Sequence, residues 1–437
     1  MHAQTHAENV IGLNDRVSLP APPRTVDDTG LHVLFLVELA AKILFLRGRM
    51  RLTELSQHLK LPATVVDAVL NFMRTERMCE VARRGETDGD VHYNLTDTGR
   101  LRAAEFLQKS QYAGTAPVNL EAYTEQVQRQ AIAEMRVTLS DVERAFNGLV
   151  VKPQLREQLG AAMNSGSAMF LYGPAGSGKT FLAEQLLRLL SGHVAVPHAI
   201  CVDNEVIQLF DPLIHETVDE GAGSPDSLYR QRHMDARWVM CRRPVSLTGG
   251  ELTLDMLNLY FDETTRFYQA PPHVKANNGL FIIDDLGRQL VSPQQLMNRW
   301  IVPMDRRHDY QALHNGYKFA IPFDVILVFS TNMTPRDIAD EAFLRRLGYK
   351  IHVGPLEESE YRSIFRDVCK AKGVPYSDDA VEYLMREHHE KDGKPLLACY
   401  PRDIVGQIRD FAVYRDEVPE LTRDALDWAW RNYFATA

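Results

Sequence analysis

Residues 168–181 read AMFLYGPAGSGKTF, and this stretch decides how the chain is expected to fold. Its first part, residues 169–172, is a short apolar run of the kind that forms a buried strand. The eight residues that follow fit the phosphate-binding pattern G-x-x-x-x-G-K-[ST]: Gly173, Pro174, Ala175, Gly176, Ser177, Gly178, Lys179 and Thr180. Residues 181–190 then have the apolar spacing of a helix. A strand, a glycine-rich loop and a helix in this order predict a nucleotide-binding α/β unit.

Each part of this loop has a chemical reason to be there. Glycines allow the backbone to fold around an anion and to turn its N–H groups inward, at a helix end that already favours negative charge. We expect all eight loop residues to contact the nucleotide, with Lys179 reaching the β- and γ-phosphates and the Thr180 hydroxyl binding Mg²⁺. The alternative is a chance glycine-rich turn, which four fixed positions between a strand and a helix disfavour.

Composition describes an ordinary globular chain of several domains. The 437 residues carry a net charge of −9, which argues against a general nucleic-acid coat but leaves room for a local basic patch. The five cysteines form no C-x-x-C pair, so neither a zinc site nor a disulfide framework is indicated. The longest apolar stretch, residues 31–46, contains Glu38 and Lys42 and is too short to span a bilayer. With no signal peptide pattern, a cytoplasmic protein without a membrane segment is expected.

The N-terminal third predicts a small helical domain behind a polar, proline-containing arm at residues 1–28. Helices are expected over residues 31–47, over residues 53–59 with Thr53 as the cap, and over residues 64–77. Alternation over residues 78–83 and 91–95, around a polar turn at residues 85–90, predicts a hairpin, and a further helix is expected to open at residue 96.

Three helices followed by a hairpin resemble a winged helix-turn-helix domain. Residues 31–110 contain twelve Lys and Arg against ten Asp and Glu, which is a weak basic balance. The first turn of the presumed recognition helix, residues 64–67, has no Arg, Asn or Gln to read base edges. Docking of a protein, or a regulatory role, is therefore favoured over DNA binding for this domain.

A second nucleotide signature lies at residues 279–285, GLFIIDD. An apolar strand that ends in acidic residues is usually called Walker B, and it places carboxylates at the sheet edge where open α/β sheets bind ligands. Asp284 is expected to hold Mg²⁺ opposite Thr180, and Asp285 to position the attacking water. A buried strand ending at an Asp-capped turn is the structural alternative, and the phosphate loop makes the functional interpretation the better one.

A third apolar strand, residues 326–331, ends at Asn332, and here the chain resembles the AAA+ ATPases. The resemblance implies that Asn332 is the sensor-1 residue, which helps to position water. It also implies that one of Arg345 and Arg346, within DEAFLRRL at residues 340–347, is an arginine finger that reaches a neighbouring subunit. Related ATPases usually carry Glu where this chain has Asp285, which is one methylene shorter.

The remaining sequence continues this resemblance over about residues 140–437. A last strand is expected at residues 349–353, followed by helices over 357–371, 378–389, 402–415 and 422–434. These helices resemble the C-terminal lid of the family, whose sensor-2 arginine is matched by Arg402. The resemblance implies that Arg402 contacts the γ-phosphate.

Two departures from a compact nucleotide-binding fold point to one branch of the family. Residues 204–278 are extra material before Walker B and include a Gly/Ser-rich turn at residues 221–224. Residues 308–322 predict a hairpin around Asn315-Gly316. Both features resemble the pre-sensor-1 hairpin branch, which includes MoxR-like ATPases and in which they act on the client. Four aromatic residues are candidates for client contact, with core packing as their default explanation: Tyr260, Phe261, Phe267 and Tyr268.

The expected fold is α/β: a P-loop AAA+ parallel sheet with a C-terminal helical lid and an N-terminal winged-helix domain. The expected divisions are an arm (1–28), the winged-helix domain (29–112), a linker and helix (113–150), the nucleotide-binding domain (151–355) and the lid (356–437). The whole chain resembles bacterial AAA-family ATPases described as chaperone-like. This implies an ATP- and Mg²⁺-dependent remodelling ATPase acting on a protein client as a homo-oligomer, expected to be a hexamer. The alternative is a nucleotide-switched DNA-binding regulator.

Overall fold

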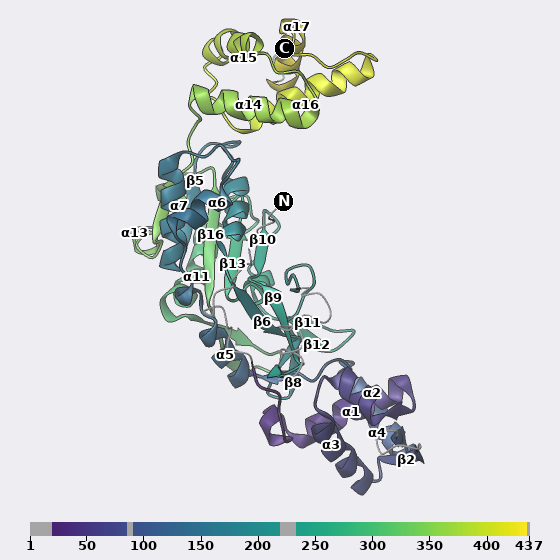
Figure 1. Cartoon of the computed structure of the whole chain (residues 1–437). Helices are drawn as coiled ribbons and strands as arrows, with labels where there is room; N and C mark the ends of the chain where they lie inside the picture. The colour runs from purple at the N-terminus through teal and green to yellow at the C-terminus, as the bar shows by residue number, and fades with distance from the viewer. Residues whose placement is uncertain (1–19, 85–90, 219–232, 339, 435–437) are drawn as a thin grey trace, which may run out of the picture.

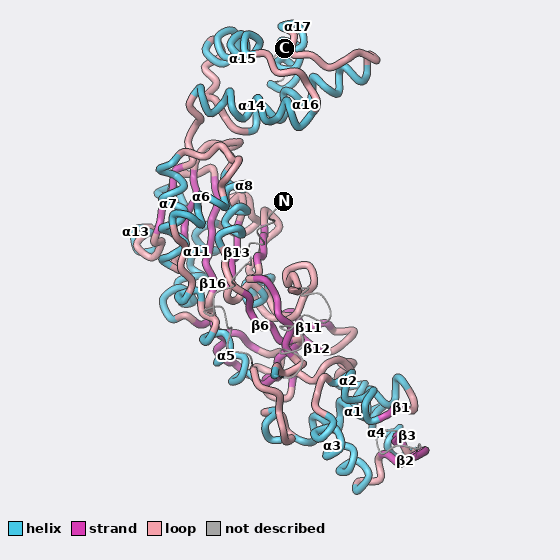
Figure 2. Tube along the Cα trace, in the orientation of Figure 1, coloured by secondary structure: helices cyan, strands magenta, loops and turns pink. Residues whose placement is uncertain are grey.

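The structure is a computed structural model, and it describes residues 20–84, 91–218, 233–338 and 340–434. The described chain is elongated (Figure 1): the C-terminal helices lie at one end and the N-terminal helices at the other. Strands are concentrated between them, as the colouring by secondary structure shows (Figure 2). The expected turns at residues 85–90 and 221–224 lie outside the described residues.

The central feature is a parallel five-stranded sheet with the order β10-β13-β16-β5-β17. The expected α/β fold with a parallel sheet is confirmed. The strand that precedes the phosphate loop is β5, and it lies between β16 and β17. The strands are β5 (Met169–Tyr172), β10 (Val245–Thr248), β13 (Gly279–Ile283), β16 (Val325–Thr331) and β17 (Tyr349–His352).

Alternate residues of the buried strands serve two different cores, as the period of two in a strand requires. Met169 and Leu171 of β5 pack with α7 (Pro153–Ser165) and α8 (Lys179–Gln185) on one face. Phe170, between them, packs with α11 (Pro293–Arg306) on the other face. Further short helices around the sheet are η2 (Ile132–Glu134), α6 (Leu139–Ala145), η3 (Leu186–Leu189), α12 (Pro335–Ile338) and α13 (Glu341–Leu344).

A β-rich region is inserted beside the central sheet. Its five-stranded sheet has the order β11-β12-β8-β7-β4, and two further pairs, β6 with β9 and β14 with β15, accompany it. The strands are β4 (Val118–Asn119), β6 (His193–Pro197), β7 (Ala199–Val202), β8 (Glu205–Gln208), β9 (Trp238–Arg242), β11 (Tyr260–Asp262), β12 (Phe267–Gln269), β14 (His308–Ala312) and β15 (Lys318–Pro322). The helices α5 (Leu120–Arg129), η4 (Asp255–Leu257) and α10 (Pro272–Lys275) flank it. The hairpin predicted at residues 308–322 is confirmed.

One segment that the sequence assigned to this insert belongs to the central sheet. Residues 245–248 form β10, which pairs in parallel with β13. The assignment of all of 204–278 to extra material was therefore wrong. Residues 245–248 read VSLT, with only two apolar residues, and no nucleotide-binding motif marks this segment, so the sequence does not separate it from the surrounding insert.

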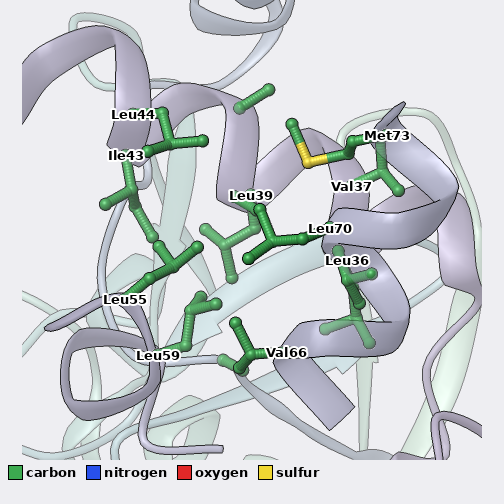
Figure 3. Close-up of a cluster of buried hydrophobic side chains, with 14 of the residues drawn as sticks. Leu36, Val37, Leu39, Ile43, Leu44, Leu55, Leu59, Val66, Leu70 and Met73 are labelled. Carbon is green, nitrogen blue, oxygen red and sulfur yellow. The ribbon is translucent and has the colours of Figure 1, made fainter. Parts of the chain in front are cut away.

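The N-terminal module packs its helices around one apolar core (Figure 3). Residues such as Leu36, Leu55 and Val66 are almost completely buried there. The module contains η1 (Asp27–Thr29), α1 (Val33–Arg47), β1 (Met50–Arg51), α2 (Leu52–Leu59), α3 (Ala63–Thr75), β2 (Cys79–Arg84), β3 (Val91–Leu95) and α4 (Asp97–Lys109). Thr53 is not the cap of α2: Arg51 occupies the N-cap, and Glu54 accepts a hydrogen bond from the Arg51 backbone N–H at 2.8 Å.

The N-terminal module is joined to the insert by buried contacts. The buried Arg237 guanidinium donates to the backbone carbonyls of Thr29 and Pro117 and forms an ion pair with Asp235. Tyr112 meets Phe267 edge to face. Residues 20–28, expected to belong to an extended arm, also make contacts: the Pro20 carbonyl accepts from the Asp235 N–H. The N-terminal module and the insert therefore share a packed interface with contacts at several points.

The C-terminal region is entirely helical within the described residues. Its helices are α14 (Glu358–Lys372), α15 (Asp378–Leu384), η5 (Met385–Glu390), α16 (Cys399–Tyr414) and α17 (Arg423–Phe434). They surround a separate core that includes Tyr361, Phe365 and Trp430. Across the whole described chain, every helix is either too short or too polar to cross a membrane.

Candidate nucleotide site

Four of the predicted site residues come together at one edge of the central sheet. The Thr180 hydroxyl donates to Asp284 Oδ2 at 2.7 Å, and Lys179 Nζ donates to Asn332 Oδ1 at 3.0 Å. They follow β5, β13 and β16, which run in parallel and therefore end at the same edge. The sheet thus brings together residues that are more than a hundred positions apart in the sequence.

The phosphate loop has a backbone that only small residues fit. Gly173, Gly176 and Gly178 have φ values of 151°, 82° and 94°. A Cβ on Gly173 would lie 2.1 Å from the Val353 carbonyl oxygen, so the backbone just after β17 passes too closely for any side chain. These positive φ values are the conformations that glycine adopts without steric cost.

The Lys179 ammonium is held by oxygen atoms of its own loop as well as by Asn332. It donates to the carbonyls of Gly173 at 3.1 Å and Pro174 at 2.9 Å. Burial lowers the pKa of Lys179, while the nearby carboxylates of Asp284 and Asp285 act in the opposite direction. Because the partners in contact are neutral oxygens, a phosphate could replace them as a stronger, charged acceptor.

Two buried polar atoms at this edge have no hydrogen-bond partner among the described residues: Asp284 Oδ1 and Ser177 Oγ. Buried polar atoms are nearly always paired, so an unpaired carboxylate oxygen at this position fits a metal or ligand contact. Mg²⁺ prefers oxygen ligands and usually keeps water and substrate phosphates around one or two protein groups. Thr180, Asp284 and the loop therefore fit a nucleotide with Mg²⁺. Across the residues that the structure describes, no cluster of three or more His, Cys, Asp or Glu forms a separate metal site.

The segment after Asp284 is braced by a residue that the sequence did not single out. Asp285 has a left-handed backbone, φ 49°, and its half-exposed carboxylate lies 3.8 Å from Arg288. The buried Gln289 amide donates to the carbonyls of Gly249 and Asp284, and its oxygen accepts from the Gly287 N–H. A lone Gln in a loop carries no sequence signal. Its role in holding the carboxylate loop follows only from these contacts.

The two candidate finger arginines lie away from the phosphate loop of their own chain and differ in their surroundings. The Arg345 side chain is 80% exposed and has only a 3.7 Å contact with Glu341, one helical turn earlier. Arg346 Nε donates to both carboxylate oxygens of Asp305, at 3.0 and 2.9 Å. Neither makes a described contact with Lys179, Thr180 or Asp284.

The lid touches the phosphate loop through residues just ahead of Arg402. The Cys399 N–H donates to the Gly176 carbonyl at 3.1 Å, and Ala398 lies beside Gly178. The Arg402 side chain is 72% exposed and pairs with Asp403 at 3.1 Å, so the structure does not bring it to the loop. The lid contact itself was missed, because a Cys at a helix start has no sequence signature for it.

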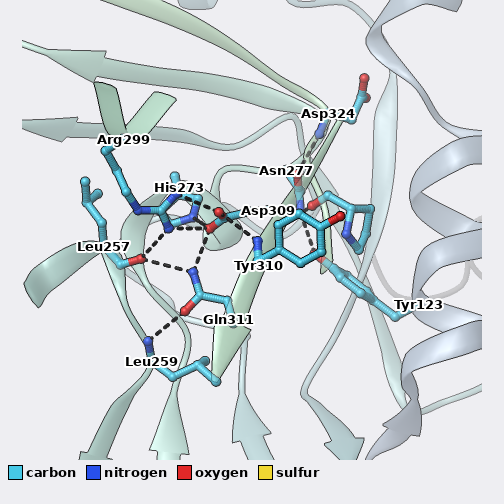
Figure 4. A network of polar contacts seen from close by, with 11 residues as sticks. Tyr123, Leu257, Leu259, His273, Asn277, Arg299, Asp309, Tyr310, Gln311 and Asp324 are labelled. Carbon is cyan, nitrogen blue, oxygen red and sulfur yellow. Dashed lines mark hydrogen bonds and ion pairs between the residues drawn. The ribbon is translucent and has the colours of Figure 1, made fainter. Parts of the chain in front are cut away.

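The hairpin β14–β15 is tied to the helix that follows Walker B by a buried polar network (Figure 4). Asp309 accepts from Arg299 at 2.6 and 2.7 Å and from His273 at 2.9 Å. Burial opposes the charged form of Asp309, but the bonds from His273 and Arg299 outweigh it and hold the pKa of this carboxyl well below its ordinary value. The Arg299–Asp309 pair thereby links the hairpin to α11.

The aromatic candidates for client contact separate into two groups. Tyr268 is buried, its hydroxyl contacts His314, and Phe261 packs on both of them. Phe267 packs against Tyr112, so all three take part in packing within the chain: Tyr268 is buried, and Phe261 and Phe267 are partly buried. Tyr260 is 64% exposed on β11 and is the one of the four that is open to a partner.

Comparison with known proteins gives distant matches. Residues 357–432 match a family described as a domain of unknown function (DUF8689). A search of curated proteins finds no significant match to the sequence.

Solved structures share parts of the arrangement. The crystal structure of NtrX from Brucella abortus is 14% identical and aligns with 65% of this chain and 56% of its own, with a TM-score of 0.40. The RuvB Holliday junction branch migration motor of Thermotoga maritima is 13% identical over 67% of this chain and 68% of its own, with a TM-score of 0.37. This chain thus spans just over half of NtrX. Similarity at this level transfers no activity, ligand or partner to it.

Proposed function

We propose that the chain is a AAA+-type ATPase that binds ATP with Mg²⁺ and hydrolyses it. The observation that carries the proposal is the convergence of Lys179, Thr180, Asp284 and Asn332 at the ends of three parallel strands. A structural turn would need neither the paired Thr180 and Asp284 nor the buried, unpaired Asp284 Oδ1 beside them.

The residues divide the work of phosphoryl transfer. Lys179 exchanges its loop carbonyls for the β- and γ-phosphates, and Thr180 and Asp284 hold Mg²⁺ between them. Asn332 and Asp285 hold the attacking water in line with the γ-phosphate. Mg²⁺ held by Thr180 and Asp284 would supply charge neutralisation at the phosphoryl oxygens, and the chain's own residues would position the phosphates and the water.

We propose that a cation from a neighbouring copy completes the site together with this chain's own Arg402, because the described ion pairs of the candidate arginines Arg345 and Arg346 are with Glu341 and Asp305 rather than with the phosphate loop. We assign this role to Arg345 rather than Arg346. Arg345 is almost fully exposed, whereas Arg346 is committed to a bidentate pair with Asp305. An arginine supplied by a neighbouring copy makes a ring-shaped homo-oligomer, with six copies as our proposed number, the working form of the protein.

The output of hydrolysis is proposed to be remodelling of a protein client. The lid contact at Gly176 makes the lid angle sensitive to the loop, and Arg402 would leave Asp403 for the γ-phosphate as the lid closes. We also propose the domain divisions expected from sequence, with the N-terminal module as a winged helix that docks protein. The bonds of Arg237 attach the N-terminal module to the insert and would transmit a movement of the insert to the protein bound by that module.

Steady-state ATPase measurement on the purified full chain tests the proposal. Lys179→Ala is expected to abolish hydrolysis, and mass photometry with a non-hydrolysable ATP analogue is expected to show a closed oligomer. Hydrolysis that persists in Lys179→Ala would show that the site has been misassigned.

A DNA-binding regulator is the second candidate function, and exposed polar side chains on α3 favour it. Asn71 is exposed there, within hydrogen-bond distance of Asp67 and Arg74. Binding of duplex DNA by the full chain, weakening steeply with salt, would favour this candidate. Its absence together with turnover stimulated by a protein client would favour the first.

A further inference from the structure

A second concentration of positive charge lies on the nucleotide-binding region, apart from the phosphate loop. A cavity of about 320 Å³ opens between α6, η3 and the segment that follows η3. Three guanidinium groups line it, from Arg136, Arg144 and Arg188, against the single carboxylate of Asp141. The net charge of the whole chain is −9, so this local excess of positive charge does not follow from the overall composition.

The one carboxylate in the cavity wall is already engaged. Asp141 Oδ2 accepts from the Thr138 N–H at 2.9 Å and from the Thr138 hydroxyl at 2.6 Å, which completes the capping box of α6. Asp141 also pairs with Arg144. The cavity wall therefore carries three guanidinium charges against one carboxylate charge, and Asp141 pairs directly with only one of the three arginines.

The remaining two arginines have no acidic partner among the described residues. Arg188 donates to the Ala145 carbonyl at 3.1 Å, and that oxygen is neutral. Arg136 is exposed, and no carboxylate in the described part of the chain forms an ion pair with it. The exposed acids Glu143 and Glu184 lie on the neighbouring helices but do not line the cavity.

A fourth guanidinium stands behind the cavity wall. The buried Arg243 donates through Nε to the Ser191 carbonyl at 2.8 Å, and Ser191 lines the cavity. Its other bonds go to the carbonyls of Gln130 and Asn278, so its direct partners are all neutral. The carboxylate of Asp324 acts on it only through space. A buried charge is poorly screened by solvent and therefore adds to the positive potential of the cavity.

We propose that this cavity binds a phosphate group, separately from the nucleotide site and independently of the proposed ATPase activity. Guanidinium groups present planar forks of N–H donors that suit the oxygens of a phosphate. Three such groups from separate segments can surround a tetrahedral anion, whereas a planar carboxylate would use only one or two of them. The phosphate belongs either to a nucleic-acid backbone or to a free phosphorylated small molecule.

Calorimetric titration of the full chain with inorganic pyrophosphate tests the proposal. A non-hydrolysable ATP analogue with Mg²⁺ is kept at saturation so that the phosphate loop is filled. The comparison is between the wild type, a double variant Arg136→Gln/Arg188→Gln, and the control Arg129→Gln, which removes an exposed arginine outside the cavity. We expect the double variant to bind pyrophosphate about tenfold more weakly or worse, and the control to bind as the wild type does.

Failure of the wild type to bind pyrophosphate, or equal binding by the double variant, overturns the proposal. Both arginines are exposed, so the double variant should fold, and an unchanged thermal melt verifies this. A second titration uses a short oligonucleotide at several salt concentrations. Oligonucleotide binding that weakens with salt and is lost in the double variant identifies a nucleic-acid backbone as the source. Loss of pyrophosphate binding alone identifies a free phosphorylated molecule.

Discussion

Lys179 and Asn332 are joined by a 3.0 Å hydrogen bond across the ends of two adjacent parallel strands, β5 and β16. The bond connects the loop that would grip the phosphates to the residue that would position water. We propose that the γ-phosphate of bound ATP takes the place of this contact between the two side chains. This relationship leads to the first prediction.

Asn332→Ala should impair turnover more than binding. Removing the amide takes away a partner of Lys179 and a group that orients water, so kcat should fall by roughly a hundredfold. Nucleotide affinity should change by only a few-fold, because the loop itself is intact. ATPase kinetics together with fluorescent-nucleotide titration measure both, with the exposed Asn147→Ala as the control. An unchanged kcat would remove Asn332 from the catalytic groups.

Substitution of the two arginines that follow α13, Arg345 and Arg346, should have different effects. Arg345→Ala should lose turnover with little change in stability, because the ion pair that it forms within the described residues is an exposed one with Glu341, one helical turn earlier. Arg346→Ala should lower thermal stability modestly, since it breaks the bidentate pair with Asp305. ATPase assays and thermal melts on both variants separate the two effects.

Mixing subunits tests whether the arginine acts on a neighbour. Arg345→Ala subunits keep Asp285, and Asp285→Ala subunits keep Arg345, so mixed rings contain some complete sites. Partial recovery of ATPase activity on mixing the two inactive variants is expected. If activity stays at the level of the separate variants, catalysis between subunits is ruled out.

Gly176→Ala should disturb the lid as well as the loop. A Cβ there would lie 2.4 Å from Cys399 Sγ, at a position whose φ is 82°. Weaker nucleotide binding is expected, with partial recovery in the double variant Gly176→Ala/Cys399→Ala, which removes the colliding sulfur. Gly373→Ala is the matched control, because its φ is 70° and no atom lies within 4 Å of the added carbon. Absence of recovery would mean that backbone strain alone accounts for the loss.

Asp309 should stabilise the fold in a pH-dependent manner. Its folded-state pKa is lowered, because the bonds from His273 and Arg299 outweigh burial. Its contribution is therefore complete above the unfolded pKa of about 4 and is lost as pH falls below that value. Asp309→Asn should cost roughly 3 kcal/mol at pH 7, because it leaves Arg299 without its charged partner and with the neutral Leu257 carbonyl as its remaining acceptor in this network (Figure 4).

The gap in unfolding free energy between wild type and Asp309→Asn should narrow below pH 4. Denaturant unfolding at pH 7, pH 5 and pH 3.5 measures it. The exposed Asp416→Asn, at a left-handed position that Asn also suits, is the control. A gap that is constant down to the lowest pH would show that Asp309 contributes through packing rather than through its charge.

Much of the central sheet could be predicted because its strands are buried on both faces. Residues 169–172 and 279–283 are continuous apolar runs, and β5 and β13 form there. The edge strand β10 could not be predicted, since its sequence, VSLT, has only two apolar residues and no motif marks its place in the chain. Likewise, the N-cap of α2 is Arg51, with Glu54 completing the capping box, although the residue-type preference for N-caps favours Thr53.

The candidate site shows the same division. Lys179, Thr180, Asp284 and Asn332 each follow a recognisable strand, and parallel strands that end at one edge must bring their next residues together. No such rule predicts Gln289 or Cys399, which reach the site from a loop and from the lid. The difference between Arg345 and Arg346 also depends on Asp305, which lies on another helix.

By itself, the sequence determined the α/β class, the phosphate loop and the order of the polar residues along the chain, because these depend on local periodicity and on residues next to one another. Only the tertiary structure decided which contacts the long-range residues make: Cys399 on Gly176, Arg346 on Asp305, and Arg243 behind a cavity of three arginines. Such contacts join segments that are far apart in the chain, and no sequence pattern relates the two segments. They are settled by how the helices and the insert pack, and packing is a property of the whole fold.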